Sequence, residues 1–268
     1  MKNHQKTTRL PSIKLFLNTF IGIMTLFSVM QSYAEINPAS GNYSHAYIDY
    51  QNAAEPFLSL KRTFNSSNAK NLSTAIGVLG KAGWSMPFLT EQLVVIRPYT
   101  TYTKVYGPYY KTNADWSQST YYKTQNYSWP GHAVIYGAAG EQLALRSDTP
   151  TSWASLTDKK ATITCASYSE ITLNPIPQAT DWGVSSATEV SSVCTSFLLQ
   201  WSNGKKQTFG KKVGSVYKLT AVTEPSGWSA TLTYNASNRL VKVTSVGGRV
   251  LSFAYNTVGN LRSITGPV

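Results

Sequence analysis

The sequence predicts an all-β protein in which antiparallel sheets and hairpins lead into a short array of β-repeats, after a cleaved signal peptide. Three observations support this prediction. Thr, Ser, Val, Tyr and Trp are abundant after residue 34, where helical periodicity is hard to find. Glycine and Asn-Gly turns recur at short intervals, as hairpins require. A sequence repeat occupies the end of the chain.

Residues 1–34 have the layout of an export signal. Four basic residues between Lys2 and Lys14 precede an apolar run from Leu15 to Met30, and the small-residue site Ser32-Tyr33-Ala34 follows. The run is about 16 residues long and a spanning helix needs roughly 20, so cleavage after Ala34 is favoured over an uncleaved anchor. We expect an exported protein that is periplasmic, secreted or at the cell surface, with no transmembrane anchor after cleavage.

The charge of the mature chain is moderately positive. Four of the 24 basic residues and none of the 12 acidic ones lie in residues 1–34, which leaves 20 − 12 = +8. After residue 34 no run of Lys and Arg is longer than a pair, so nucleic acid is not an expected partner. The positive balance is either a solvated basic surface or a means of association with anionic envelope polymers.

The mature chain divides into a β domain at 35–210 with a Tyr-rich middle and a repeat region at 211–268. Two hairpins are predicted in the first part. One pairs the strands between Phe197 and Phe209 across Asn203-Gly204, and the other pairs residues 134–136 with residues 143–145. The Tyr-rich middle is either a glycan-binding aromatic surface or a set of strand cores and edges. Its tyrosines are Tyr99, Tyr102, Tyr106, Tyr109, Tyr110, Tyr121, Tyr122 and Tyr127.

Cys165 and Cys194 are the two cysteines of the chain. In an exported protein an even number of cysteines favours a disulfide, and the alternative is two separate buried thiols. Two cysteines without a nearby histidine do not form a metal-ligand set, so no metal is expected.

Apolar and turn positions recur with a constant period from Leu219 onward, because 240 − 219 = 21 and 261 − 240 = 21 for the three leucines. Within a copy, Trp228, Ala230, Leu232 and Tyr234 alternate with Ser229, Thr231 and Thr233, which predicts a strand with one buried face. A turn beginning at Asn235 or Asn256 then leads into a Leu-x-x-Val/Ile strand. The positions of the repeat are Leu219, Val222, Gly227, Leu232, Tyr234, Asn235, Leu240, Val243, Gly248, Phe253, Tyr255, Asn256, Leu261 and Ile264.

The spacing Gly-x6-Tyr-Asn-x2-Asn/Gly-x-Leu-x2-Val/Ile-Thr resembles the YD repeat of Rhs proteins, with Asn235 and Asn256 where the consensus has Asp. The front of the mature chain is also similar to these proteins. It has the segment 37–41 (Asn-Pro-Ala-Ser-Gly), the alternating strand 58–64, and glycines at 77, 80 and 83 before Trp84. The resemblance implies the N-terminal portion of an Rhs protein with the first YD repeats, truncated before the core motif and the toxin region. In that family many repeats coil into a sheet that encloses a toxin.

The sequence offers no catalytic constellation, so we expect a protein that is not an enzyme and that needs no cofactor. His45 and His132 lie in no metal-ligand or nucleophile spacing, and His45 is interpreted as a surface or satisfied structural histidine. Asp49 and Glu55 are interpreted as a solvated pair, with an acid and base couple as the alternative.

Two hypotheses of function remain. The first is a non-catalytic structural fragment of an Rhs/YD-repeat secreted shell or surface assembly. The alternative is an adhesive module that binds envelope polymer or glycan through the Tyr-rich middle. Under the first, the strand around Leu261 and Ile264 has no successor to pair with. We therefore expect further YD-repeat polypeptide, or another copy of the protein, to cover this C-terminal edge.

Overall fold

The computed structural model describes residues 33–37, 42–53, 55–66, 83–138, 141–156, 161–175 and 183–267. These residues form eighteen strands, which confirms the all-β prediction. No helix in the described ranges is long and apolar enough to cross a membrane. Residues 1–32 of the predicted export signal lie outside the described residues, as do Gly77 and Gly80 of the front motif.

The strands form two sheets, and every strand pair is antiparallel. The smaller sheet has the order β1 (Tyr33–Asn37), β2 (Asn42–Tyr50), β3 (Leu60–Asn65) and β4 (Trp84–Ser85). The larger, fourteen-stranded sheet contains β5 (Gln92–Arg97), β6 (Tyr99–Thr112), β7 (Gln118–Trp129), β8 (Gly131–Tyr136), β9 (Gln142–Ser147), β10 (Ser152–Ser155), β11 (Ala161–Leu173), β12 (Val184–Trp201), β13 (Lys206–Val213), β14 (Val216–Thr223), β15 (Ser229–Tyr234), β16 (Leu240–Ser245), β17 (Val250–Tyr255) and β18 (Leu261–Thr265).

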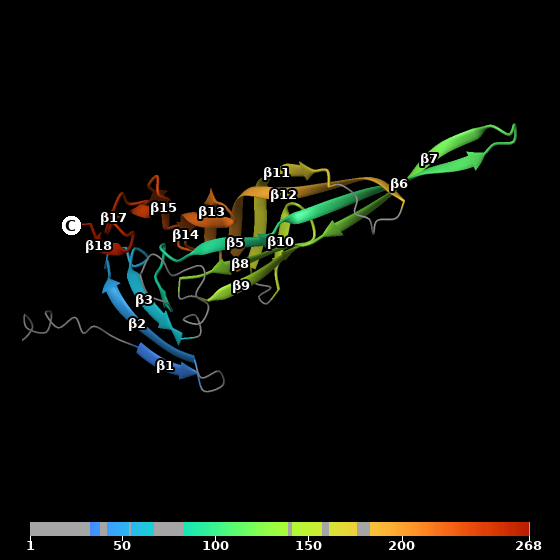
Figure 1. Ribbon diagram of the computed structural model, residues 1–268. Coiled ribbons are helices and arrows are strands. Elements are labelled where there is room, and N and C mark those ends of the chain that lie inside the picture. The colour runs from blue at the N-terminus through green and yellow to red at the C-terminus, as the bar shows by residue number, and fades with distance from the viewer. Residues whose placement is uncertain are drawn as a thin grey trace, which may run out of the picture.

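The pairing order of the larger sheet places two extensions on a central body. From β14 the pairings run through β5, β8, β9, β10 and β11 to β12, and β13 pairs with both β12 and β14. From β14 the sheet continues outward as β15, β16, β17 and β18, and from β12 it continues as β6 and β7. Figure 1 shows the two extensions at opposite ends of the molecule.

Large apolar side chains fill the centre of the body. Trp153, Phe197 and Tyr217 pack edge to face, with ring centroids 5.5 Å apart for the first pair and 4.9 Å for the second. Such T-shaped pairs are favoured by the ring quadrupoles. The hydroxyl of Tyr217 donates a hydrogen bond of 2.5 Å to the carbonyl of Cys194, and burial raises its pKa to about 12. Tyr217 therefore stays neutral at physiological pH and keeps this hydrogen bond.

Both predicted hairpins are confirmed. Phe197 pairs with Phe209, and Gly204 in the turn has a φ of +92°, a value that favours glycine. Ile135 pairs with Leu143 in the β8–β9 hairpin. The division of the chain at residue 210 stays a prediction.

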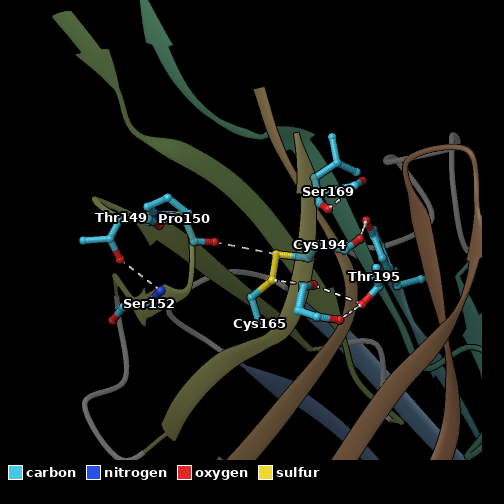
Figure 2. The surroundings of a disulfide bond; sticks show 11 residues. Thr149, Pro150, Ser152, Cys165, Ser169, Cys194 and Thr195 are labelled. Carbon is cyan, nitrogen blue, oxygen red and sulfur yellow. Dashed lines mark hydrogen bonds between the residues drawn. A yellow bond between two sulfur atoms is a disulfide. The ribbon is translucent and has the colours of Figure 1, made fainter. Parts of the chain in front are cut away.

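The predicted disulfide between Cys165 and Cys194 is confirmed, with a Cα–Cα distance of 5.7 Å. Figure 2 shows it between β11 and β12, next to Pro150 and Ser152. The register of β11 against β12 shifts at Cys165 and Ser167, so the bond joins the strands where their ladder is irregular. Both cysteines are buried. The disulfide therefore ties the two strands together at the boundary of the core.

The Tyr-rich middle does not fill the core. All eight of its tyrosines lie on β6 and β7, a long hairpin that projects from the body in Figure 1. Strand β7 is the edge of the sheet and is exposed along its whole length. The expectation of strand cores is thus wrong for these tyrosines, and the expectation of strand edges is confirmed for those on β7. The sequence reasoning failed because a strand with aromatic residues on both faces carries no signal of which face, if any, is covered.

Candidate functional site

The repeat strands bury one face, as the alternation predicted. Ala230 and Leu232 on β15 are buried, and Thr231 and Thr233 between them are exposed. The faces of β16 and β17 that carry Leu240, Val243 and Phe253 join the same hydrophobic core. Tyr234, Tyr255, Leu261 and Ile264 pack against that core while partly buried. The predicted common core of the repeat is therefore present.

The tyrosine of each repeat bonds its strand to the neighbouring Leu strand. The hydroxyl of Tyr234 donates to the carbonyl of Leu219, and the hydroxyl of Tyr255 donates to the carbonyl of Leu240, both at 2.6 Å. Burial raises the pKa of both phenols, to about 12 for Tyr255. The two hydroxyls therefore stay protonated at physiological pH and can donate. Donors and acceptors of the two bonds are each one sequence period apart, so this bond is a structural unit of the repeat.

The asparagine after each tyrosine closes the following turn. The side-chain oxygen of Asn235 accepts the backbone N–H of Arg239 at 2.9 Å, and that of Asn256 accepts the N–H of Asn260 at 2.8 Å. Asn238 in the first of these turns has a φ of +58°, a left-handed conformation that Asn tolerates better than most residues. An Asp carboxylate could accept the same N–H. The replacement of Asp by Asn in the YD-like motif thus preserves the turn.

Sequence reasoning missed a cation that also recurs with the repeat. The ammonium of Lys218 lies 6.0 Å from the ring centroid of Tyr234, and the guanidinium of Arg239 lies 5.8 Å from that of Tyr255. These two basic residues are one period apart and directly precede Leu219 and Leu240. The spacing of 21 residues between Lys218 and Arg239 could have shown from the sequence that a basic residue belongs to the repeat. The third copy has Asn260 at this position.

Glu55 joins the segment after β2 to the repeat region. Its carboxylate accepts hydrogen bonds from Nε1 of Trp228 at 3.2 Å and from a guanidinium nitrogen of Arg249 at 3.1 Å. The side-chain hydrogen bond from Ser245, the largest effect, and those from Trp228 and Arg249 lower its pKa although burial opposes them. Phe57 packs on Trp228 beside it, with ring centroids 5.7 Å apart. Glu55 therefore holds the N-terminal segment on the repeats.

The interpretation of Asp49 and Glu55 as a solvated pair is wrong for Glu55, which is buried. The two carboxylates also have different partners, because Asp49 forms an ion pair with Arg62 at 2.5 Å. The sequence could not show this, since the partners of Glu55 lie 173 and 194 residues away.

We expect Glu55→Gln to lower the free energy of unfolding by about 1 to 3 kcal/mol at pH 7, because Arg249 and Trp228 lose a charged acceptor. Because folding lowers the pKa of Glu55, its charged carboxylate stabilises the protein at pH values above the ordinary carboxyl pKa of 4.5. This stabilisation is lost as the pH falls through the folded-state pKa. The gap between wild type and variant in urea titrations should therefore close in acid. Asp49→Asn, which breaks a partly exposed pair, is the matched control and should cost little. Equal losses for both variants, or a gap independent of pH, would contradict the role of Glu55.

A second buried carboxylate lies inside the body. Glu91 accepts hydrogen bonds from the backbone N–H of Phe88 at 2.7 Å and from Nε2 of Gln207 at 2.8 Å. Oε1 of Gln207 in turn accepts from Nε1 of Trp201 at 3.1 Å. Burial raises the pKa of Glu91. These bonds satisfy both carboxylate oxygens, so the network is interpreted as structural.

The described residues contain no group of three or more His, Cys, Asp and Glu side chains that could hold a metal ion. His45 lies among aromatic rings on β2, with its ring centroid 4.3 Å from that of Tyr47 and 6.2 Å from that of Tyr43. Its Nδ1 is buried without a hydrogen-bond partner in the described structure, so the ring is packed but not fully satisfied. The absence of enzymatic activity stays a prediction.

The outermost repeat strand, β18, pairs with β17 and forms an end of the larger sheet. Its other side faces a groove of about 520 Å³, whose opposite wall is formed by Asp49, Arg62, Trp84 and Met86. The N-terminal sheet therefore lies beside the terminal strand, as Figure 1 also shows. The predicted unpaired edge is present among the described strands, and residues of the N-terminal sheet lie across the groove from it.

Residues 218–250 match the RHS Repeat family. This segment is therefore similar to an RHS repeat. The matched segment runs from within β14 to the first residue of β17, and it includes the Tyr234 hydroxyl bond, the Asn235 turn and the Lys218 cation. No curated protein matches the chain. The family match supports the resemblance to Rhs/YD-repeat proteins in the region where the sequence period was found.

Proposed function

We propose that the protein is a non-catalytic structural component of an exported RHS/YD-repeat assembly, in which further repeat strands add to β18. The observation that carries the proposal is the recurring pairing of a Leu strand with a Tyr strand. Leu219 on β14 and Leu240 on β16 each accept a tyrosine hydroxyl from the strand that pairs next to them. Leu261 on β18 occupies the same position one period later. A strand of the Gly-x6-Tyr type can therefore add to β18 by the same pattern.

The placement of the chain at the N-terminal end of such an assembly, ahead of the core and toxin regions, is part of this proposal. It is supported by the front motif from Asn37 to Trp84 and by its position beside the RHS repeats. In the structure that motif contributes strands β2, β3 and β4, which lie next to β18. The partner is then further YD-repeat polypeptide or a second copy of the protein.

Strand addition is tested with a peptide that reproduces β17 with its flanking residues, 247–256. Without peptide, amide exchange should be slow through residues 228–246 and fast after Asn256, because the terminal strand is paired on one side. With peptide, exchange in β18 should slow. The same peptide carrying Tyr255→Phe is the matched control and should bind more weakly, since it cannot donate to the carbonyl of Leu261. Unchanged exchange in β18 at saturating peptide would overturn the proposal.

Export is proposed from the charged start, the apolar run and the small-residue site of residues 1–34. We expect the mature protein to begin at Glu35 and to be found outside the cytoplasm. N-terminal sequencing of protein recovered from the periplasmic and extracellular fractions measures this directly. Recovery of the full chain with Met1 in the cytosol would contradict it.

A further inference from the structure

Strands β6 and β7 form an arm that extends beyond the end of β12. Strand β12 pairs with β6 only as far as the contact of Val184 with Tyr106, and the β6–β7 hairpin continues without it to the pair Thr112 and Gln118. The register of the arm shifts between Tyr106 and Tyr109. Gly107 lies in this shift with a φ of +132°, and a Cβ there would meet the ring of Tyr122 at 2.9 Å. The arm is therefore a two-stranded ribbon with a defined bend.

Paired residues of an antiparallel ladder share one face of the sheet. The register places five tyrosines and three lysines on the same face of the arm, which we name the tyrosine–lysine face. Its members are Tyr102, Tyr106, Tyr109, Tyr121, Tyr127, Lys104, Lys111 and Lys123. The opposite face has Thr, Ser, Asn and Val up to the bend, and Tyr110 and Tyr122 beyond it. The basic charges of the arm are thus collected on one face.

Contacts within the arm order these rings before any partner binds. Tyr109 stacks on Tyr121 with centroids 5.4 Å apart, and the ammonium of Lys123 lies 5.4 Å from the centroid of Tyr109. Nearer the body, Tyr102 stacks on Trp129 at 5.7 Å. Rings held in this way lose little conformational freedom when a ligand packs on them.

The turn at the end of the arm presents a tryptophan to solvent. Trp116 has a φ of +63°, which is unfavourable for a bulky residue, and its side chain is 88% exposed. Hydrogen bonds fix the turn around it: the N–H of Asn113 donates to the carbonyl of Ser117, and the N–H of Trp116 donates to the carbonyl of Asn113. Asp115 accepts from both the N–H and the hydroxyl of Ser117. The indole is therefore held outward by a formed turn.

The composition of the arm indicates which chemistry it fits. Residues 99–129 contain eight tyrosines, two tryptophans and three lysines, but no Phe, Leu, Ile, Met or Arg. Bilayer insertion draws on aliphatic side chains, and bidentate phosphate recognition draws on Arg, and the arm lacks both kinds of residue apart from one valine. Tyrosine and tryptophan offer an apolar ring for the C–H face of a sugar and a polar group for its hydroxyls. Lysine supplies charge for carboxylate or sulfate groups.

Charge on the neighbouring strands places the ligand toward the outer part of the arm. Glu189 on β12 lies opposite Tyr102 and so adds a carboxylate at the base of the tyrosine–lysine face. Lys123 lies opposite Tyr106, the last residue of β6 that β12 reaches, and Lys111 lies farther out, where β12 no longer pairs with the hairpin. Two of the three lysines of the arm therefore lie from the bend outward, on the part that also carries Tyr109, Tyr121 and Trp116, and the turn at the tip adds one carboxylate, Asp115.

We propose that the outer tyrosine–lysine face of the arm binds an acidic polysaccharide. Sugar rings pack on the Tyr109–Tyr121 pair and on Trp116, and carboxylate or sulfate groups pair with Lys111 and Lys123. This site is independent of strand addition at β18, which lies at the other end of the molecule.

The test measures binding of the full mature protein to alginate, a polyuronate, against neutral dextran, anionic phospholipid vesicles and oligo(dT). Alginate should bind and the other three should bind at least about tenfold more weakly, and added salt should weaken alginate binding because the lysines contribute charge. Tyr109→Ala with Tyr121→Ala should lower alginate affinity about tenfold or more, since two stacking rings are lost. Lys111→Gln with Lys123→Gln should lower affinity and reduce its salt dependence.

Tyr110→Ala with Tyr122→Ala is the matched control, because it also removes two tyrosine rings, but from the opposite face of the same segment. Alginate affinity should then change less than about twofold. Denaturant midpoints equal to that of the wild type show that each variant is folded. No alginate binding, equal losses for the two tyrosine pairs, or tighter binding to vesicles or oligo(dT) would each overturn the proposal.

Discussion

Replacing Leu232 with alanine should lower the free energy of unfolding by about 2 to 5 kcal/mol, whereas Thr231→Ala should change it little. Leu232 is 7% exposed and pairs with Val243 of β16 inside the common core of the repeats. Thr231, the adjacent residue on the same strand, points to solvent. The two variants share a strand and a backbone environment, so the difference between them measures how much the buried face of the repeat contributes to stability.

Urea denaturation of the full mature protein gives both values, provided that the slope of free energy against urea is unchanged between variants. Equal and small effects at the two positions would show that the alternation of β15 does not mark a packed face. The interpretation of the repeats as a sheet that buries a continuous core would then have to be given up. Phe253→Ala, at the position equivalent to Leu232 one repeat later, should show a similarly large loss.

The features predicted correctly from the sequence are those encoded by short-range spacing. The alternation around Leu232 has the period of a strand, and the turn after Tyr234 contains residues that tolerate a left-handed backbone. The hairpin across Gly204 follows the same logic. In each case the signal and the structure it specifies lie within about twenty residues of each other, so no knowledge of the rest of the chain was needed.

The features that were missed depend on contacts between distant segments. Glu55 was a carboxylate with no informative neighbour, and its partners Trp228 and Arg249 belong to the repeats. The buried network of Glu91 and Gln207 spans 116 residues. A single sequence gives no measure of such pairing, because a polar residue at a strand end is equally compatible with solvent and with a buried partner.

The arm illustrates a different limit of sequence reasoning. Tyrosine and threonine are favoured in strands whether they are buried or exposed, so residues 99–129 read as strand without revealing their surroundings. The register of β6 against β7 also shifts at Gly107, between the tyrosines near the body and those farther out. The strand order leaves β7 at the edge of the sheet, and its aromatic side chains are exposed there. The choice between a glycan-binding surface and strand cores therefore required the strand order, which a single sequence does not give.

Replacing both Cys165 and Cys194 with alanine should lower the free energy of unfolding by about 3 to 4 kcal/mol, the value that the chain-entropy model gives for a closed loop of about 30 residues. Their sequence separation is 29 residues. Denaturant unfolding of the oxidised wild type against the variant measures the loss. Dithiothreitol should destabilise the wild type and leave the variant unaffected, which separates the bond itself from the change in side-chain volume. Two alkylatable thiols in oxidised protein would show that the bond does not form.

The position of the disulfide also predicts where the loss should be felt. The β11–β12 ladder is irregular between Cys165 and Ser167, so the covalent bond holds the strands together where backbone pairing is weakest. Inward of it, Ile163 and Leu199 are paired and buried in the core, while outward of Tyr168 the side chains of β11 are exposed. Amide exchange in the double variant should therefore rise more in residues 168–173 than in residues 161–164. A uniform rise along β11 would mean that the bond stabilises the whole sheet and does not specifically hold the outer part of β11 on β12.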